Sequence, residues 1–382
     1  MKVILVTYIF LFTISFLFSK ENMKYYFFII SLTFSIIALF FVPDESMDLY
    51  RHYEYLDVLR DYGWKLAITV SPFGSSIVAN LYFYLISFLG VNGLLPAITA
   101  FITYYLTLNR IYEVALKYNC SKANILLSTF YFISMLGYLS LISGIRSLLA
   151  FALFSYFLYI DLVENKKKIL CWSIYIALSL FHSSVWVLLI FRVMLRFYNK
   201  FTRIAYIAFL TTWSLNIANI INFIDNFSNI KILQELQQKV SLYTVGGYFT
   251  DYSIRDSLII LIVICITFLF FLYTNRNQNK EMKSYFDYII LIIAFCIGSI
   301  NYYRVFVSFV AVLYFLSPTY ILLINHNPVF GFIRKQRCKH NKQYNSHNIS
   351  LNYIFTLIII EVSIYKLLIL FKKEYLYMIF KL

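Results

Sequence analysis

Long apolar stretches separated by short polar connections recur along almost the whole chain. Each stretch is apolar throughout and lacks the alternation of polar and apolar positions that membrane-barrel strands show, so the pattern predicts helices. About 20 apolar residues cross a bilayer, with a usable range of roughly 17–25. We therefore expect an all-α, polytopic transmembrane helical bundle with about ten full spans. The expected spans are 3–19, 25–42, 93–110, 125–142, 144–160, 204–224, 256–274, 285–300, 303–324 and 353–371.

A further apolar stretch, 72–90, is long enough to cross a bilayer but does not fit this count. Counting it as a span would place Arg110, Lys117 and Lys122 outside, whereas positive side chains favour the cytoplasmic side. We expect 72–90 to lie along the outer interface or to re-enter, which returns those three side chains to the cytoplasm.

The stretch 169–191 raises the same difficulty, because it lies between two basic clusters, Lys166–Lys168 and the arginines and lysine of 192–203. A single crossing would put one cluster on the wrong side of the membrane. A re-entrant hairpin that enters and leaves on the cytoplasmic side keeps both clusters inside, with Phe181–Ser184 near its tip. Non-helical backbone at that depth is tolerated where it is buried in protein or lines a cavity.

The polar loops complete a single integral membrane domain, 1–382, in this prediction. Residues 43–91 form an outer loop with an interfacial helix, since six acidic residues face three basic ones between positions 43 and 71. Residues 225–255 form a second outer loop, and the basic stretch 325–352 is a cytoplasmic loop.

Composition and charge agree with a membrane protein. The chain is 61% hydrophobic and 13% charged, which leaves too few polar residues to cover a water-exposed surface. The net charge of +15 suits nucleic acid, but the lysines and arginines lie mostly between apolar segments, as membrane topology predicts. We expect the lipid bilayer as a partner and no nucleic acid. The five cysteines form no CxxC pair and are interpreted as small buried hydrophobes.

The first candidate for chemistry is the stretch 44–53, at the mouth of the second expected span. Carboxylates accept hydrogen bonds from sugar hydroxyls and can act as a base, and tyrosines stack on sugar faces. The alternative is a solvated loop with helix-capping carboxylates. If the stretch is helical, Asp48, Arg51 and His52 share one face. The candidate residues are Asp44, Asp48, Tyr50, Arg51, His52 and Tyr53.

Two arginines lie between expected spans on the outer side, Arg146 after Ser143 and Gly144, and Arg304 after Tyr303. Arginines on that side run against the positive-inside bias. Each could anchor a helix end by snorkelling. Two such exceptions in one chain nevertheless favour an anionic ligand, because a guanidinium group binds phosphate in a bidentate manner.

His182 lies at the expected hairpin tip. A lone histidine in an apolar stretch is commonly a hydrogen-bonded core residue, although ionisable groups inside a membrane favour a functional role. The sequence contains no HExxH, P-loop, GxGxxG or DxD motif, so neither a metal nor another cofactor is expected.

Taken in order, these motifs resemble those of the EpsG/Wzy-type polysaccharide polymerases, multi-span proteins of capsule and exopolysaccharide assembly. The resemblance covers about residues 1–325, and its most specific pieces are Gly144–Ala150 and Phe181–Ser184. The chain departs from the family pattern at Ser71, where many members have Glu, and at Ser147, where Gln commonly follows the arginine. The motifs are Asp48–Tyr53, Ser71–Phe73, Gly144–Ala150, Phe181–Ser184 and Arg304.

The resemblance implies a metal- and nucleotide-independent glycosyltransferase in the bacterial cytoplasmic membrane. It would polymerise undecaprenyl-pyrophosphate-linked oligosaccharide repeat units on the outer face, alongside a flippase and a chain-length regulator. Arg146 and Arg304 would hold the departing pyrophosphate, and Asp48 or Asp44 would orient or deprotonate the acceptor hydroxyl. His182 would position a donor or acceptor group. Substrate binding is assigned to Tyr50, Arg51, His52, Tyr53 and Tyr303.

Other functions stay open on the sequence alone. A flippase or another transporter of lipid-linked oligosaccharide would show an internal repeat and charges near the bilayer midplane, whereas no repeat is found and the distinctive polar positions cluster on one face. An O-antigen ligase shares the chemistry of the polymerase and differs in its acceptor. A membrane O-acyltransferase would carry an Asn or Asp signature to match its histidine, and none is found.

Overall fold

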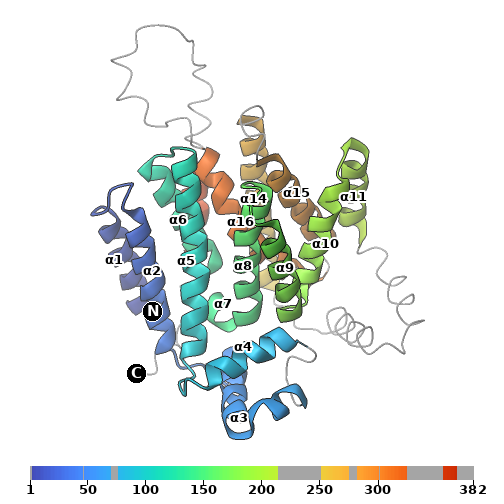
Figure 1. The fold of residues 1–382 in the computed structure, drawn as a ribbon. Coiled ribbons are helices and arrows are strands. Elements are labelled where there is room, and N and C mark those ends of the chain that lie inside the picture. Colours follow the sequence, from blue (N-terminus) through green and yellow to red (C-terminus); the bar gives the residue numbers. More distant parts are fainter. Residues whose placement is uncertain are drawn as a thin grey trace, which may run out of the picture.

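The computed structural model describes residues 2–45, 47–69, 76–213, 251–274, 282–300, 302–324 and 356–367. Every regular element in these residues is a helix and none is a strand, which confirms the all-α prediction (Figure 1). The Ser71–Phe73 motif, most of the expected outer loop 225–255 and the whole of the expected cytoplasmic loop 325–352 lie outside the described residues.

The helices follow one another along the chain with short connections. In chain order they are α1 (Lys2–Ser15), α2 (Met23–Leu39), α3 (Asp48–Thr69), α4 (Ile77–Ser87), α5 (Leu94–Lys117), α6 (Lys122–Leu136), α7 (Tyr138–Ser143), α8 (Ile145–Leu162), α9 (Lys168–Phe181), α10 (Ser184–Met194), η1 (Leu195–Phe197), α11 (Lys200–Thr212), α14 (Asp251–Thr274), α15 (Lys283–Gly298) and α16 (Tyr303–Ile324). Residues 356–367 are also helical.

Two helical segments among the described residues are long and apolar enough to cross a membrane, Ile145–Leu162 of α8 and Arg304–Leu323 of α16. The expected count of about ten full-length spans is therefore not reached. Several helices at other expected positions are shorter or more polar, although α14 has 24 residues. α1 has 14 residues, a rise of about 21 Å. α5 has 24 residues but carries Arg110 at the end of the expected span 93–110, and Glu113 and Lys117 beyond it.

The expected single helix over 125–142 is wrong, because the chain breaks at Gly137. This residue has φ 66° and ψ 115°, a backbone conformation that residues with a Cβ rarely adopt. α6 ends before it and the short helix α7 begins after it. Hydropathy alone does not show the break, since the residues on both sides of Gly137 are apolar.

Three connections meet at one end of the bundle. In the turn after α1, Lys20 Nζ donates to Asn119 Oδ1 in the turn after α5, at 2.7 Å. Near the end of α5, Arg110 Nη1 donates to Glu164 Oε1 in the connection after α8, at 2.8 Å. We call this end the basic end, and it is formed by residues 16–22, 118–121 and 163–167.

The opposite end carries α3 and α4, where α3 packs against α4 and α7, and α4 packs against α9 (Figure 1). α8 and α15 run antiparallel, because the rings of Tyr159 and Tyr285 lie 5.8 Å apart and those of Phe154 and Tyr288 lie 6.1 Å apart. The start of α8 therefore lies at the same end as the last turn of α15 and the start of α16. We call this end the α3–α4 end.

The outward faces of several helices are apolar, and charged side chains lie inside. On α10, Trp186, Ile190 and Val193 are exposed, whereas Arg192 is buried and pairs with the buried Asp161, at 2.6 Å. A helix on the surface of a water-soluble protein shows the reverse arrangement. The same exposed apolar stripe runs along α2 through Tyr25, Phe28, Leu32 and Ile36.

Candidate functional site

His52 of α3 and Arg146 of α8 come close together at the α3–α4 end, although they lie far apart in the sequence. The His52 ring is 9% exposed and packs edge-on against Phe83 of α4, with ring centroids 5.1 Å apart. Burial, together with the positive charges of Arg146 and then of Arg51, lowers the pKa of His52 to about 3. The imidazole is therefore neutral at neutral pH, and the electrostatic effect of Arg146 links the start of α8 to α3.

The expected shared face of Asp48, Arg51 and His52 is found only in part. Arg51 Nη2 and Asp48 Oδ1 form an ion pair at 3.2 Å, and both side chains are largely exposed. His52 instead belongs to the buried stripe of α3, together with Leu49 and Leu56. The helix turns by about 100° per residue, so the imidazole reaches the core while its two charged neighbours face solvent.

The start of α8 is shaped by the residues around Gly144. α7 ends at Ser143 and α8 begins at Ile145, so Arg146 lies in the first turn of α8 and is half-buried. Ser147 Oγ donates to Gly144 O at 3.1 Å. Ser147 thus has a local structural role at the start of α8. A guanidinium group beside the first turn of a helix is a favourable setting for an anion.

The expected break at Phe181–Ser184 is present, since α9 ends at Phe181 and α10 begins at Ser184. His182 has extended backbone, with φ −145° and ψ 125°. Its ring contacts Phe151 of α8, with centroids 5.9 Å apart, and so lies little more than one helical turn from the position of Arg146 on α8. Just before α4, Ser76 Oγ donates to Phe181 O at 3.2 Å, which holds the α9–α10 turn at the α3–α4 end.

The remaining sequence candidates lie at the same end in different settings. Arg304 is exposed in the first turn of α16, and the side chain of Tyr303 lies outside the described residues. Tyr53 donates from its hydroxyl to Phe41 O at 3.3 Å, so it ties α3 to the end of α2. Tyr50 is half-buried, and Asp44 is exposed in the connection before α3.

Sequence reasoning missed two charge clusters at or near the basic end, each built on a buried arginine. Arg192 Nε pairs with Asp161 Oδ2, which also accepts from the hydroxyl of Tyr175 at 3.3 Å. Arg110 Nη1 contacts Glu113 Oε2 at 2.9 Å and Glu164 Oε1 at 2.8 Å. The sequence signal for both is a charged residue at the edge of an apolar stretch, which hydropathy treats as the end of a span.

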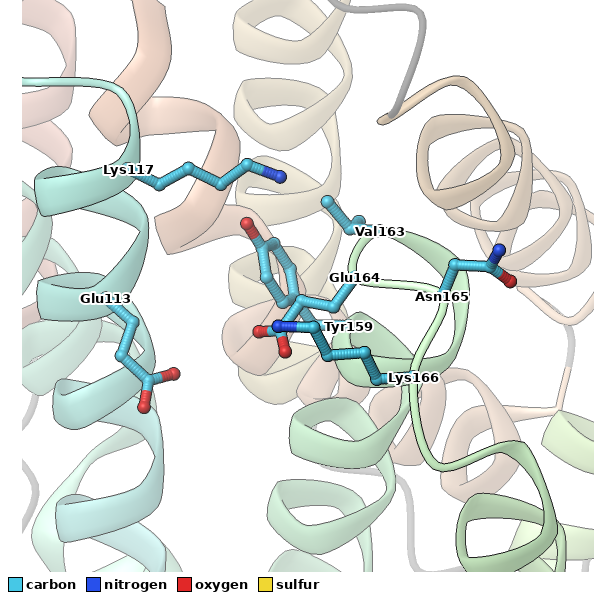
Figure 2. A pocket seen from close by; sticks show the side chains of 7 residues that line it. All are labelled: Glu113, Lys117, Tyr159, Val163, Glu164, Asn165 and Lys166. Carbon is cyan, nitrogen blue, oxygen red and sulfur yellow. The ribbon is translucent and has the colours of Figure 1, made fainter.

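The second cluster borders a cavity of about 580 Å³ between the end of α5 and the α8–α9 connection (Figure 2). Most of the side chains around this cavity are polar or charged. They are Glu113, Lys117, Tyr159, Val163, Glu164, Asn165 and Lys166.

No group of three or more histidine, cysteine, aspartate or glutamate side chains among the described residues is placed to hold a metal ion. Comparison with known proteins adds no relative, since no protein-family model, curated protein or solved structure matches the chain.

Proposed function

We propose that the chain is a polytopic membrane glycosyltransferase that polymerises undecaprenyl-pyrophosphate-linked oligosaccharide repeat units on the outer face of the bacterial cytoplasmic membrane. One observation carries the proposal: at the end of the bundle opposite the lysine-bearing turns, Arg146, the acidic helix α3 and the His182 turn come together. The positive-inside rule makes the basic end cytoplasmic and therefore makes the α3–α4 end external.

The membrane setting rests on two properties of the helices. The segments Ile145–Leu162 and Arg304–Leu323 meet the length and hydropathy that a crossing requires. The exposed apolar stripes on α2 and α10 would meet lipid, because such stripes have no favourable exposure to water. In this proposal further helices of the bundle also cross the membrane, and α9 and α10 form the re-entrant hairpin.

The proposed reaction transfers a sugar chain between two lipid-linked molecules. A hydroxyl oxygen of the acceptor repeat unit forms a bond to the anomeric carbon of the donor chain. The bond between that carbon and the pyrophosphate oxygen breaks, and undecaprenyl pyrophosphate leaves with the electron pair. Asp48 or Asp44 accepts the hydroxyl proton, and Arg146 with Arg304 stabilises the negative charge of the leaving group.

His52 has a positioning role in this scheme. Its neutral imidazole is closed to solvent between α3 and α4 and lies near Arg146. Because its imidazole is neutral, His52 adds no positive charge to those of Arg146 and Arg51, which both act on it. His182 and the exposed Arg51 complete the group, with Tyr50 and Tyr53 on the same helix as Arg51.

The proposal is tested in a polysaccharide-producing strain that depends on this chain. Replacing Arg146 or Arg304 with alanine should abolish polymer while single lipid-linked repeat units accumulate, and the protein should remain in the membrane. Arg196→Ala is the matched control, because Arg196 lies near the basic end, where it stacks on Trp172. Full-length polymer from both test variants would remove the pyrophosphate role and leave the arginines as helix-end anchors.

A further inference from the structure

A cavity lies at the basic end, on the side away from the proposed active site. Figure 2 shows Glu113 and Lys117 extending into it from α5, with Tyr159, Glu164 and Lys166 facing them from the end of α8 and the connection that follows. Its volume of about 580 Å³ is in the range of pockets that hold small ligands.

The two carboxylates at the cavity are already compensated from within the protein. Arg110 is buried and contacts Glu113 and Glu164 through the same nitrogen, at 2.9 and 2.8 Å. Its guanidinium group also lies over the rings of Tyr156 and Tyr159, 4.4 and 4.3 Å from the centroids. Arg110 therefore fixes both acids in place, and the two lysines give the cluster a net positive charge.

The hydroxyl group of Tyr159 is the observation that points to a ligand. Tyr159 is 2% exposed, and its hydroxyl has no hydrogen-bond partner among the described residues. Buried hydroxyl groups almost always have a partner. In Figure 2 the ring directs this hydroxyl into the cavity, on the side where Lys117 extends from α5. If Arg110 only joined α5 to α8, the ion pairs would be explained, but the buried hydroxyl of Tyr159 without a hydrogen-bond partner would not.

We propose that this cavity binds a phosphate group, carried by an anionic lipid headgroup or by a small phosphorylated solute. The amines of Lys117 and Lys166 and the hydroxyl of Tyr159 are hydrogen-bond donors, and phosphate offers only acceptors and negative charge. The cavity lies at the end of the bundle that bears the lysine-rich turns, where an anionic leaflet or a cytoplasmic solute would reach it. The inference needs only the cavity and holds whichever reaction the opposite end performs.

The test measures phosphate binding to the purified full-length chain. Inorganic phosphate and glycerol 3-phosphate are titrated in detergent, and binding is followed by thermal stabilisation and calorimetry. Nanodiscs of phosphatidylglycerol are compared with nanodiscs of phosphatidylcholine by native mass spectrometry. Binding of the soluble phosphates identifies a solute site, and retention of phosphatidylglycerol alone identifies a headgroup site.

Two variants remove donors, and one serves as a control. Tyr159→Phe keeps the ring that packs on Arg110 and removes a hydroxyl that has no hydrogen-bond partner among the described residues. The variant should therefore fold normally and weaken binding about tenfold or more. Lys117→Gln should weaken binding to a similar degree. Tyr104→Phe removes another buried hydroxyl that lacks a partner in the part of the chain the structure describes. Tyr104 lies 13 positions before Lys117 on α5, so this variant should leave phosphate binding unchanged. The proposal is overturned if none of the probes binds, or if wild type and both test variants bind equally.

Discussion

Replacing Arg192 with leucine should weaken the fold strongly, because the change leaves a buried carboxylate without its counter-charge. Arg192 Nε lies 2.6 Å from Asp161 Oδ2, and the Asp161 side chain is 0% exposed. The second oxygen, Oδ1, has no hydrogen-bond partner among the described residues. After the substitution the hydroxyl of Tyr175, 3.3 Å from Oδ2, would be the hydrogen-bond donor left to this carboxylate among the described residues.

The size of the loss in unfolding free energy follows from the unpaired carboxylate of Asp161 that remains in the variant. Removing one partner of a buried ion pair costs about 3–5 kcal/mol, whereas replacing both partners with apolar residues is close to neutral. Arg192→Leu should therefore lower the free energy of unfolding by about 3–5 kcal/mol. The double variant Asp161→Leu, Arg192→Leu should recover most of that loss. Arg51→Leu is the control, since the Arg51–Asp48 pair is largely exposed and such pairs contribute less than about 1 kcal/mol.

The assay is equilibrium unfolding of the purified protein in mixed detergent micelles, followed by circular dichroism. Equal free energies of unfolding for Arg192→Leu and Arg51→Leu would refute the explanation by a buried, unpaired carboxylate. It also fails if the double variant is as unstable as the single one, because the loss would then come from packing against Trp172, which lies 5.3 Å from the guanidinium group, and not from the stranded charge.

Three further predictions address the α3–α4 end and the orientation of the bundle. A cysteine placed at Glu54 should react with a membrane-impermeant reagent from outside and one at Lys166 only from inside; equal labelling of both from one side would contradict the assignment of the two ends. Asp48→Asn should slow chain extension about 100-fold or more, and a normal rate with loss in Asp44→Asn would move the base to Asp44. Because burial and Arg146 lower the pKa of His52 to about 3, the folded state resists protonation that the unfolded state accepts near its ordinary pKa of about 6.5. The contribution of His52 to the free energy of unfolding is therefore fully present above about pH 6.5 and falls by about 2 kcal/mol between pH 7 and pH 5. His52→Gln should remove this fall. An unchanged slope of unfolding free energy against pH in the variant would refute the prediction.

The apolar pattern predicts the helices well where each helix ends at a polar connection. α8 and α16 begin within two residues of the expected starts at 144 and 303. The break at Phe181–Ser184 follows from charge, since only a turn there keeps both flanking basic clusters on one side. These helix starts and this break depend on the hydropathy and charge of whole segments, which can be read from a single sequence.

Other features depend on partners that are distant in the sequence. α5 continues past Arg110, the expected end of its span, because Glu164 in the α8–α9 connection neutralises the arginine. His52 leaves the solvent-facing side of α3 because Phe83 of α4 packs on it. Neither Glu164 nor Phe83 can be identified as the partner from the sequence, since many other acidic and aromatic residues could make the same contacts. Gly137 is a local break, but nothing in its apolar surroundings marks it.

Chain extension by the purified protein tests the central claim most directly. The chain is reconstituted in liposomes with a synthetic undecaprenyl-pyrophosphate-linked repeat unit as the sole sugar source, without nucleotide sugar or added metal. The account predicts longer lipid-linked glycans and one undecaprenyl pyrophosphate released for each repeat unit joined. Arg146→Ala should abolish both products while Arg196→Ala retains them. Movement of the repeat unit across the bilayer without any chain extension would contradict the account and favour a transporter.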